Sequence, residues 1–178
     1  DSYSETKRAY DSVKDAVVTL DNCNYTYDGA AHYPQVSVKN KSGEPLVKGR
    51  DYSLEYFDNG KEAGTHYVGV ILDGGVINAY YTTAVKSVSS VNLTPLQAGF
   101  KAEWQKQTDC VSGYEIQYSQ NKNFKNAVTV RITDNSISSK KITGLRQDCN
   151  YYVRIRAYYN GSSGRCVSDY TSAKEVKT

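Results

Sequence analysis

Residues 151–158 read Tyr-Tyr-Val-Arg-Ile-Arg-Ala-Tyr, an uninterrupted alternation of two kinds of side chain. A period of two places successive side chains on opposite faces of a β-strand. Tyr151, Val153, Ile155 and Ala157 are therefore expected to face a core. The same pattern recurs in short runs separated by turn residues, for example at residues 66–72, 100–104, 114–118 and 128–132. The sequence predicts an all-β protein built of antiparallel sandwiches.

The composition of the 178 residues agrees with β-structure, because the chain has 17 tyrosines, no methionine and 3 prolines. No apolar run approaches the roughly 20 residues of a membrane span, and no signal segment opens the sequence. These features exclude a membrane-spanning, a disordered or a collagen-like chain. The sequence starts at Asp1 without a methionine, which indicates a fragment or a processed piece. Helical periodicity occurs only in residues 5–17, and residues 1–15 are expected to form a short helix or a linker.

The net charge of +3 is unevenly distributed along the chain. Up to Lys86 there are 9 Lys and Arg against 12 Asp and Glu, a net charge of −3. The remainder has 13 against 7, a net charge of +6. No clustered basic run occurs, so a nucleic-acid partner is not expected.

Several motifs in the second half occur in a specific order. Trp104 ends one alternating run, Gly113-Tyr-Glu-Ile-Gln-Tyr-Ser119 follows, and Gly144-Leu145 precedes the run that begins at Tyr151. Residues 87–178 thereby resemble a fibronectin type III domain, in the version found in surface and secreted proteins of Gram-positive gut bacteria. The resemblance implies that Trp104 lies in the core and that the Tyr151 hydroxyl bonds back to the backbone at a corner. One departure is the brief segment Asn160–Gly164, which is often longer in such domains.

The first half contains Tyr25-Thr-Tyr-Asp-Gly29, Pro34-x-Val-x-Val38 and several further turn pairs. Residues 16–86 resemble the bacterial immunoglobulin-like repeats that carry a Tyr-Asp-Gly motif. Asp28-Gly29, Lys48-Gly49 and Asn59-Gly60 are expected to supply positive-φ positions between strands. The resemblances together imply two tandem sandwiches, the first immunoglobulin-like and the second of the fibronectin type III class.

Catalytic and metal-binding motifs are scarce. His32 and His66 lie in no recognisable catalytic triad. His66 alternates in step with Val68, Val70 and Leu72, so it is expected on a sheet face or at a sheet end rather than in a cleft. No phosphate-binding or dinucleotide loop occurs, and the carboxylates near turns do not match a calcium loop, although a weak calcium site stays open. The cysteines have neither zinc-ligand spacing nor a Cys-x-x-Cys pair. We therefore expect no enzyme activity, no cofactor and no metal.

Cys23, Cys110, Cys149 and Cys166 have two interpretations. The fibronectin resemblance places the loops of Cys110 and Cys166 at one pole of the domain, which implies a Cys110–Cys166 disulfide. The alternative is that all four are free, because many Gram-positive surface proteins avoid disulfides.

The outward side chains of residues 151–158 form a candidate binding surface. Tyr and Arg are enriched at binding hot spots, and Glu and Gln of the neighbouring strand are expected to join them. The candidate residues are Tyr152, Arg154, Arg156, Tyr158, Glu115 and Gln117. The alternative is that they are cross-strand pairs that only stabilise a solvated sheet.

These observations favour a non-catalytic, monomeric segment of an extracellular protein, either secreted or on a bacterial cell surface. Its expected role is adhesion to a host glycoprotein, an immunoglobulin or a glycan, or the spacing of another module. The competing interpretation is an accessory region of a secreted carbohydrate-active or other hydrolytic enzyme, with its catalytic domain outside these residues.

Overall fold

The computed structural model describes residues 15–178, and these contain strands, turns and loops but no helix. The all-β prediction is confirmed. The predicted helix over residues 5–17 lies almost entirely outside the described residues, and at its end Val17 begins a strand. The described chain forms two compact units: the first comprises its residues up to Tyr25, Ala31–Gly60 and Thr65–Thr82, and the second Thr26–Ala30, Lys61–Gly64 and Thr83–Thr178.

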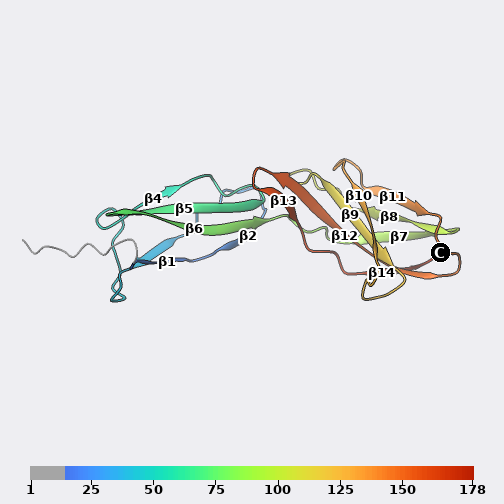
Figure 1. The fold of residues 1–178 in the computed structure, drawn as a ribbon. Coiled ribbons are helices and arrows are strands. Elements are labelled where there is room, and N and C mark those ends of the chain that lie inside the picture. The colour runs from blue at the N-terminus through green and yellow to red at the C-terminus, as the bar shows by residue number, and fades with distance from the viewer. Residues whose placement is uncertain (1–14) are drawn as a thin grey trace, which may run out of the picture. The chain divides into compact units, whose positions relative to one another are not determined.

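The first unit contains a two-stranded and a four-stranded sheet, both antiparallel where their registers are defined (Figure 1). The small sheet pairs β1 (Val17–Leu20) with β3 (Val36–Lys39). The larger sheet has the order β2 (Asn24–Thr26), β6 (Gly75–Ala84), β5 (Gly64–Leu72) and β4 (Ser53–Tyr56).

The core of the first unit is small, and alternating positions of its strands supply it. Its buried members are Val38, Tyr52, Val70 and Leu72. His66, which shares the parity of Val70, is also buried, and its Nδ1 lies 2.9 Å from the Asp58 carboxylate. The residues of β5 between these positions therefore face away from the core.

Turn glycines in the first half of the chain have the backbone conformation that their motifs predict. Gly29, Gly49 and Gly60 have φ values of 85°, 83° and 60°. An L-residue with a Cβ rarely adopts these values, which is why glycine follows Asp, Lys or Asn at each turn.

The second unit contains a three-stranded and a five-stranded sheet (Figure 1). The first has the order β11 (Ser139–Thr143), β8 (Gly99–Trp104) and β7 (Val91–Leu96). The second has the order β10 (Val128–Ile132), β9 (Gly113–Ser119), β12 (Asn150–Gly161) and β13 (Gly164–Val167), and β14 (Lys174–Lys177) pairs with β12 as well.

The core of the second unit confirms the predicted inward positions. Trp104 is buried in it together with Tyr151, Val153, Ile155 and Ala157. The Tyr151 hydroxyl accepts a hydrogen bond from the Arg146 backbone N–H at 3.4 Å, which is the expected bond of a tyrosine corner. The alternation along β12 therefore fixes which of its side chains remain on the outer face.

Candidate functional site

The outer face of the five-stranded sheet collects arginines, aromatic rings and the buried carboxylate of Glu115, with the exposed Glu175 of β14 opposite Tyr152. Gln117 lies opposite Arg154 and Glu115 opposite Arg156 in the pairing of β9 with β12. Glu115 also lies opposite Arg131 of β10. We call this surface the arginine face and define it by the residues Glu115, Gln117, Phe124, Arg131, Tyr152, Arg154, Arg156, Tyr158, Arg165 and Tyr170.

Glu115 is the centre of a charge network. Its side chain is only 3% exposed, and its two oxygens accept hydrogen bonds from Arg165 at 2.6 Å, Arg156 at 2.9 Å and Arg131 at 3.2 Å. Burial alone would raise the pKa of this carboxyl group. The hydrogen bonds from the three guanidinium groups outweigh burial, and the pKa of Glu115 lies below its ordinary value.

Arg154 is held by hydrogen bonds and by two aromatic rings. Its Nε and Nη2 atoms donate to Gln117 Oε1 at 2.8 and 2.6 Å. Its guanidinium carbon lies 3.9 Å from the ring centre of Phe124 and 4.2 Å from that of Tyr170. The Tyr170 ring also lies 4.5 Å from the Arg156 guanidinium carbon, so cation–π contacts link the two arginines.

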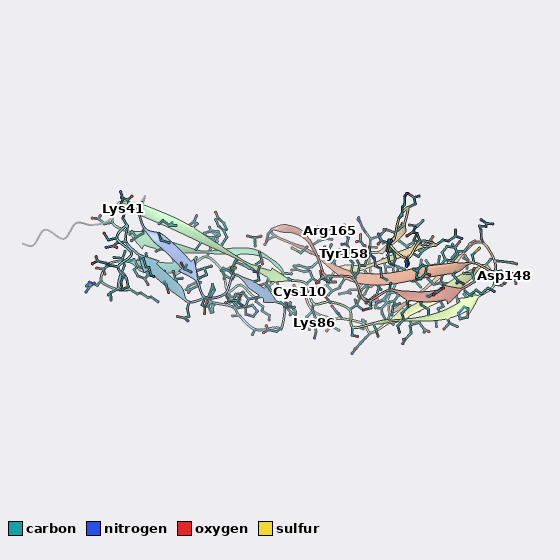
Figure 2. All side chains as sticks on the ribbon, turned by 90° about the horizontal axis from the view of Figure 1, so that it is seen from below. Lys41, Lys86, Cys110, Asp148, Tyr158 and Arg165 are labelled. Atoms are coloured by element: carbon teal, nitrogen blue, oxygen red, sulfur yellow. The ribbon has the colours of Figure 1, made fainter. Side chains whose placement is uncertain are left out.

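Tyr158 shares the outward parity of Arg154 and Arg156, yet it is only 3% exposed. The Arg165 guanidinium carbon lies 4.4 Å and that of Arg131 5.9 Å from its ring centre. Figure 2 shows Arg165 and Tyr158 close together near one end of the unit. The Tyr158 hydroxyl donates to the Ile132 carbonyl at 3.4 Å. The ring is therefore a buried support for two arginines.

The segment between β13 and β14 positions Tyr170. Ser168 and Thr171 each exchange hydrogen bonds with β12: their backbone N–H groups donate to the carbonyls of Ala157 and Ile155 at 2.9 and 2.8 Å. In return, their hydroxyls accept hydrogen bonds from the N–H groups of the same two β12 residues at 3.0 and 3.1 Å. The two hydroxyls thus take the place of backbone carbonyls as acceptors for β12. Tyr170 lies within this anchored segment and stacks on two arginines of β12.

All six candidate residues of the sequence lie on this face, but their accessibility differs from the expectation. Tyr158 and Glu115 are buried, and Arg154 is not a free solvent-facing side chain. The Arg131 side chain is 54% exposed and is the more accessible cation. The sequence reasoning missed four members, Phe124, Arg131, Arg165 and Tyr170. The alternation of β10 could have indicated Arg131, whereas the other three lie in loops or on a short edge strand.

The four cysteines are free thiols. The implied Cys110–Cys166 disulfide is therefore not formed in this structure, and the pairing stays a prediction. Both side chains pack against the core of the second unit. Burial is the main cause that raises the pKa of the Cys110 thiol, and Cys166 is close enough to contribute.

Groups of three or more His, Cys, Asp or Glu suited to a metal ion do not occur within residues 15–178. In the same residues, no helix is long and apolar enough to cross a membrane.

Residues 83–173 match the sequence profile of the fibronectin type III domain, which is just over half of the chain. The chain belongs to the fibronectin type III family. Its second unit carries the match, together with the core tryptophan and the tyrosine corner of this fold. Fibronectin type III domains occur in extracellular and cell-surface proteins and are generally non-catalytic modules.

Two curated relatives are the contactin-6 proteins of Rattus norvegicus and Mus musculus. Each is 30% identical over 80 residues, which is 44% of this chain. The match covers only 8% of their own length. Among solved structures, one titled as a cytokine receptor complex is similar with a TM-score of 0.53 and 15% identity, covering 90% of this chain and 96% of that chain. This likeness concerns the fold and is consistent with two β-sandwiches.

Proposed function

We propose that this fibronectin type III protein is a non-catalytic, monomeric binding segment of an extracellular protein, and that the arginine face contacts its partner. The observation that supports this proposal is the network around Glu115. Three arginines, at positions 131, 156 and 165, surround the Glu115 carboxylate, and Arg154 beside them is held by Gln117 and by aromatic rings. Holding a long cationic side chain in place lowers the entropy that it loses on binding.

The chemistry of the arginine face favours an acidic partner. Each guanidinium carries five donors, and the bonds to Glu115 and Gln117 use only part of them. The remaining donors match carboxylate, sulfate or phosphate oxygens. An acidic glycoprotein or an acidic glycan therefore fits this surface better than a neutral ligand.

The motifs in the first half of the chain support a bacterial surface or secreted protein with a host partner. Gly29 and Gly60, in the pairs Asp28-Gly29 and Asn59-Gly60, have positive φ, and these motifs resemble those of bacterial immunoglobulin-like repeats. We propose on this basis that the partner is a host glycoprotein, an immunoglobulin or a host glycan.

A second candidate function is a spacer, and the internal pairing of the same arginines favours it. Glu115 and Gln117 already accept hydrogen bonds from all four guanidinium groups. Such cross-strand pairs also stabilise a sheet that binds nothing.

A binding screen of the full chain against panels of glycans and serum proteins tests the proposal. Two variants remove accessible side chains of the arginine face, Arg131→Gln and Tyr152→Ala. We expect each to weaken binding of an identified partner by about tenfold or more, since central anchors contribute on the order of 2 kcal/mol. Binding is also expected to weaken as salt screens the arginines.

Lys140→Gln is the matched control, because Lys140 is an exposed cation on β11 of the other sheet. It should leave affinity unchanged. If both variants of the arginine face bind every identified partner as tightly as the parent chain does, the face is scaffold and the spacer function is favoured.

A further inference from the structure

The outward face of β4, β5 and β6 in the first unit is apolar and open. On β5, Tyr67 and Ile71 lie on the other face between the core residues, and Gly69 between them has the same parity but is itself buried among its neighbours. On β6 the exposed positions beside them are Val76, Asn78 and Tyr80, and the exposed parity continues to Thr82 and Ala84. We call this surface the β4–β6 face and define it by the residues Glu55, Phe57, Tyr67, Gly69, Ile71, Val76, Asn78 and Tyr80.

One row of the β4–β6 face is aromatic. Phe57 and Tyr67 stack with ring centres 4.6 Å apart, and Tyr67 and Tyr80 lie 5.8 Å apart. Phe57 is 70% and Tyr80 60% exposed. Rings that stack side by side on neighbouring strands present their edges outward, so the row forms an apolar ridge.

Gly69 separates this ridge from the exposed aliphatic pair Ile71 and Val76. It lies opposite Glu55 in the pairing of β4 with β5. A Cβ placed on Gly69 would lie 3.3 Å from Val76 Cγ1 and 3.8 Å from Asn78 Oδ1. The row through Gly69 therefore has the Glu55 carboxylate on β4 and the Asn78 amide on β6, with a buried residue that lacks a side chain between them.

The charge of this sheet is purely acidic. The strands β2, β4, β5 and β6 contain no Lys or Arg, and Glu55 is their one carboxylate. The pKa of Tyr67 is raised, first by burial and then by Tyr80, Glu55 and Asp58, so the Glu55 and Asp58 carboxylates lie near enough to the ridge to act on the Tyr67 hydroxyl.

We propose that the β4–β6 face binds a protein segment that presents an arginine or lysine side chain between apolar residues. The apolar stem of that side chain lies over Gly69, between the aromatic ridge and the aliphatic pair, and its charged end reaches Glu55. This site is separate from the arginine face and does not depend on the function proposed for it.

Other ligands fit these residues less well. Nucleic acid and acidic glycans would bring negative charge to Glu55 and Asp58 without a compensating cation. A neutral glycan could bond to Asn78 and Glu55 but would leave the aliphatic pair without an apolar partner. Aromatic residues with few charges are the composition of a protein interface core.

Selection of a random peptide library, displayed on phage, for binding to the full chain tests the proposal. Phage that also bind the Gly69→Leu variant are removed before each round. Gly69 has no positive φ, and the nearest atom to its Cβ would be a methyl group of the exposed Val76 at 3.3 Å, which needs to shift only by a few tenths of an ångström, so this variant is expected to fold. The selected peptides should carry Arg or Lys beside apolar residues. A synthetic peptide of the selected sequence should bind at least about tenfold more weakly to Gly69→Leu and to Glu55→Gln.

Two further measurements keep the test decisive. Phe57→Ser removes an exposed ring and should also weaken binding of the peptide. This variant takes the place of Gly69→Leu in the test if circular dichroism shows that Gly69→Leu is misfolded. Replacing the peptide's basic residue by Gln should remove most of the effect of Glu55→Gln, because the two groups pair. The controls Glu44→Gln and Val47→Ser, exposed residues of the same unit, should bind normally.

Selected peptides without a basic residue, or equal binding to the parent chain and to both Gly69→Leu and Phe57→Ser, would overturn the proposal. So would a neutral glycan that binds the parent chain on an array and is lost with Gly69→Leu.

Discussion

Glu115 is a carboxylate that the fold removes from water and surrounds with three guanidinium groups. A buried charge is tolerated only when it is paired and hydrogen-bonded, and the three bonds from Arg131, Arg156 and Arg165 meet this condition. Removing the carboxylate would leave these arginines to repel one another across a few ångströms. Glu115→Ala is therefore expected to destabilise the second unit by roughly 3 kcal/mol. Urea unfolding measures it, and Glu103→Ala should cost far less, because the Glu103 side chain is 44% exposed and pairs with the partly exposed Lys101.

The lowered pKa of Glu115 also predicts a dependence of stability on pH. Its contribution is fully present above the ordinary glutamate pKa of about 4.3 and is lost as pH falls through the lower folded-state pKa. Thermal unfolding between pH 7 and pH 3 should show the parent chain losing more stability below about pH 4 than Glu115→Gln does. Parallel losses in the two proteins would contradict this expectation.

Cys110 and Cys166 give a second prediction for single residues. Oxidised glutathione should join them in the parent chain, releasing reduced glutathione as two thiols become one disulfide. The raised pKa of Cys110 leaves little thiolate at neutral pH, so the reaction should be slow and should accelerate as pH rises. Peptide mapping by mass spectrometry identifies the bridge. A Cys166→Ser variant that forms an equivalent disulfide from Cys110 to another cysteine would show that the pairing is wrong.

At the scale of elements, the segment between β13 and β14 depends on two hydroxyl groups. Ser168→Ala and Thr171→Val each leave a buried backbone N–H of β12 without its side-chain acceptor. We expect each substitution to cost about 1–3 kcal/mol. Ser172→Ala is the control, because Ser172 is exposed and adjacent, and its cost should be near zero. Denaturation curves in which all three variants unfold together would contradict this role of the hydroxyls.

Strands were the most predictable elements, because alternation in β5, β8, β9 and β12 reports directly which face is buried. Turn glycines were predictable for a similar reason, since few other residues adopt positive φ. The members of the arginine face outside regular alternation were not predictable. Phe124 covers Arg154 from a loop and has a φ of 57°, a conformation that its side chain does not favour and that only the surrounding contacts explain. The burial of Tyr158 on β12 likewise depends on Arg165, which lies on β13, the next strand of the hairpin.

At the scale of the whole molecule, the two units differ in charge and in the size of their cores. The chain up to Lys86 is acidic and the remainder is basic. The acidic β4–β6 face and the cationic arginine face therefore belong to different units. One core comprises a small set around Val70, and the other is larger and draws on residues from Ala63 to Val176.

Because each unit has its own core, we expect two separable unfolding transitions, and the single tryptophan distinguishes them. Trp104 lies in the second core, so its fluorescence should follow only the second unit. Leu72→Ala and Ile155→Ala each remove a buried aliphatic side chain, at a cost of about 2–5 kcal/mol to the unit that holds it. Ile155→Ala should shift the fluorescence transition to lower denaturant. Leu72→Ala should leave it in place while circular dichroism detects earlier loss of β-structure. If Leu72→Ala shifts the fluorescence transition as far as Ile155→Ala does, the two cores unfold as one cooperative structure.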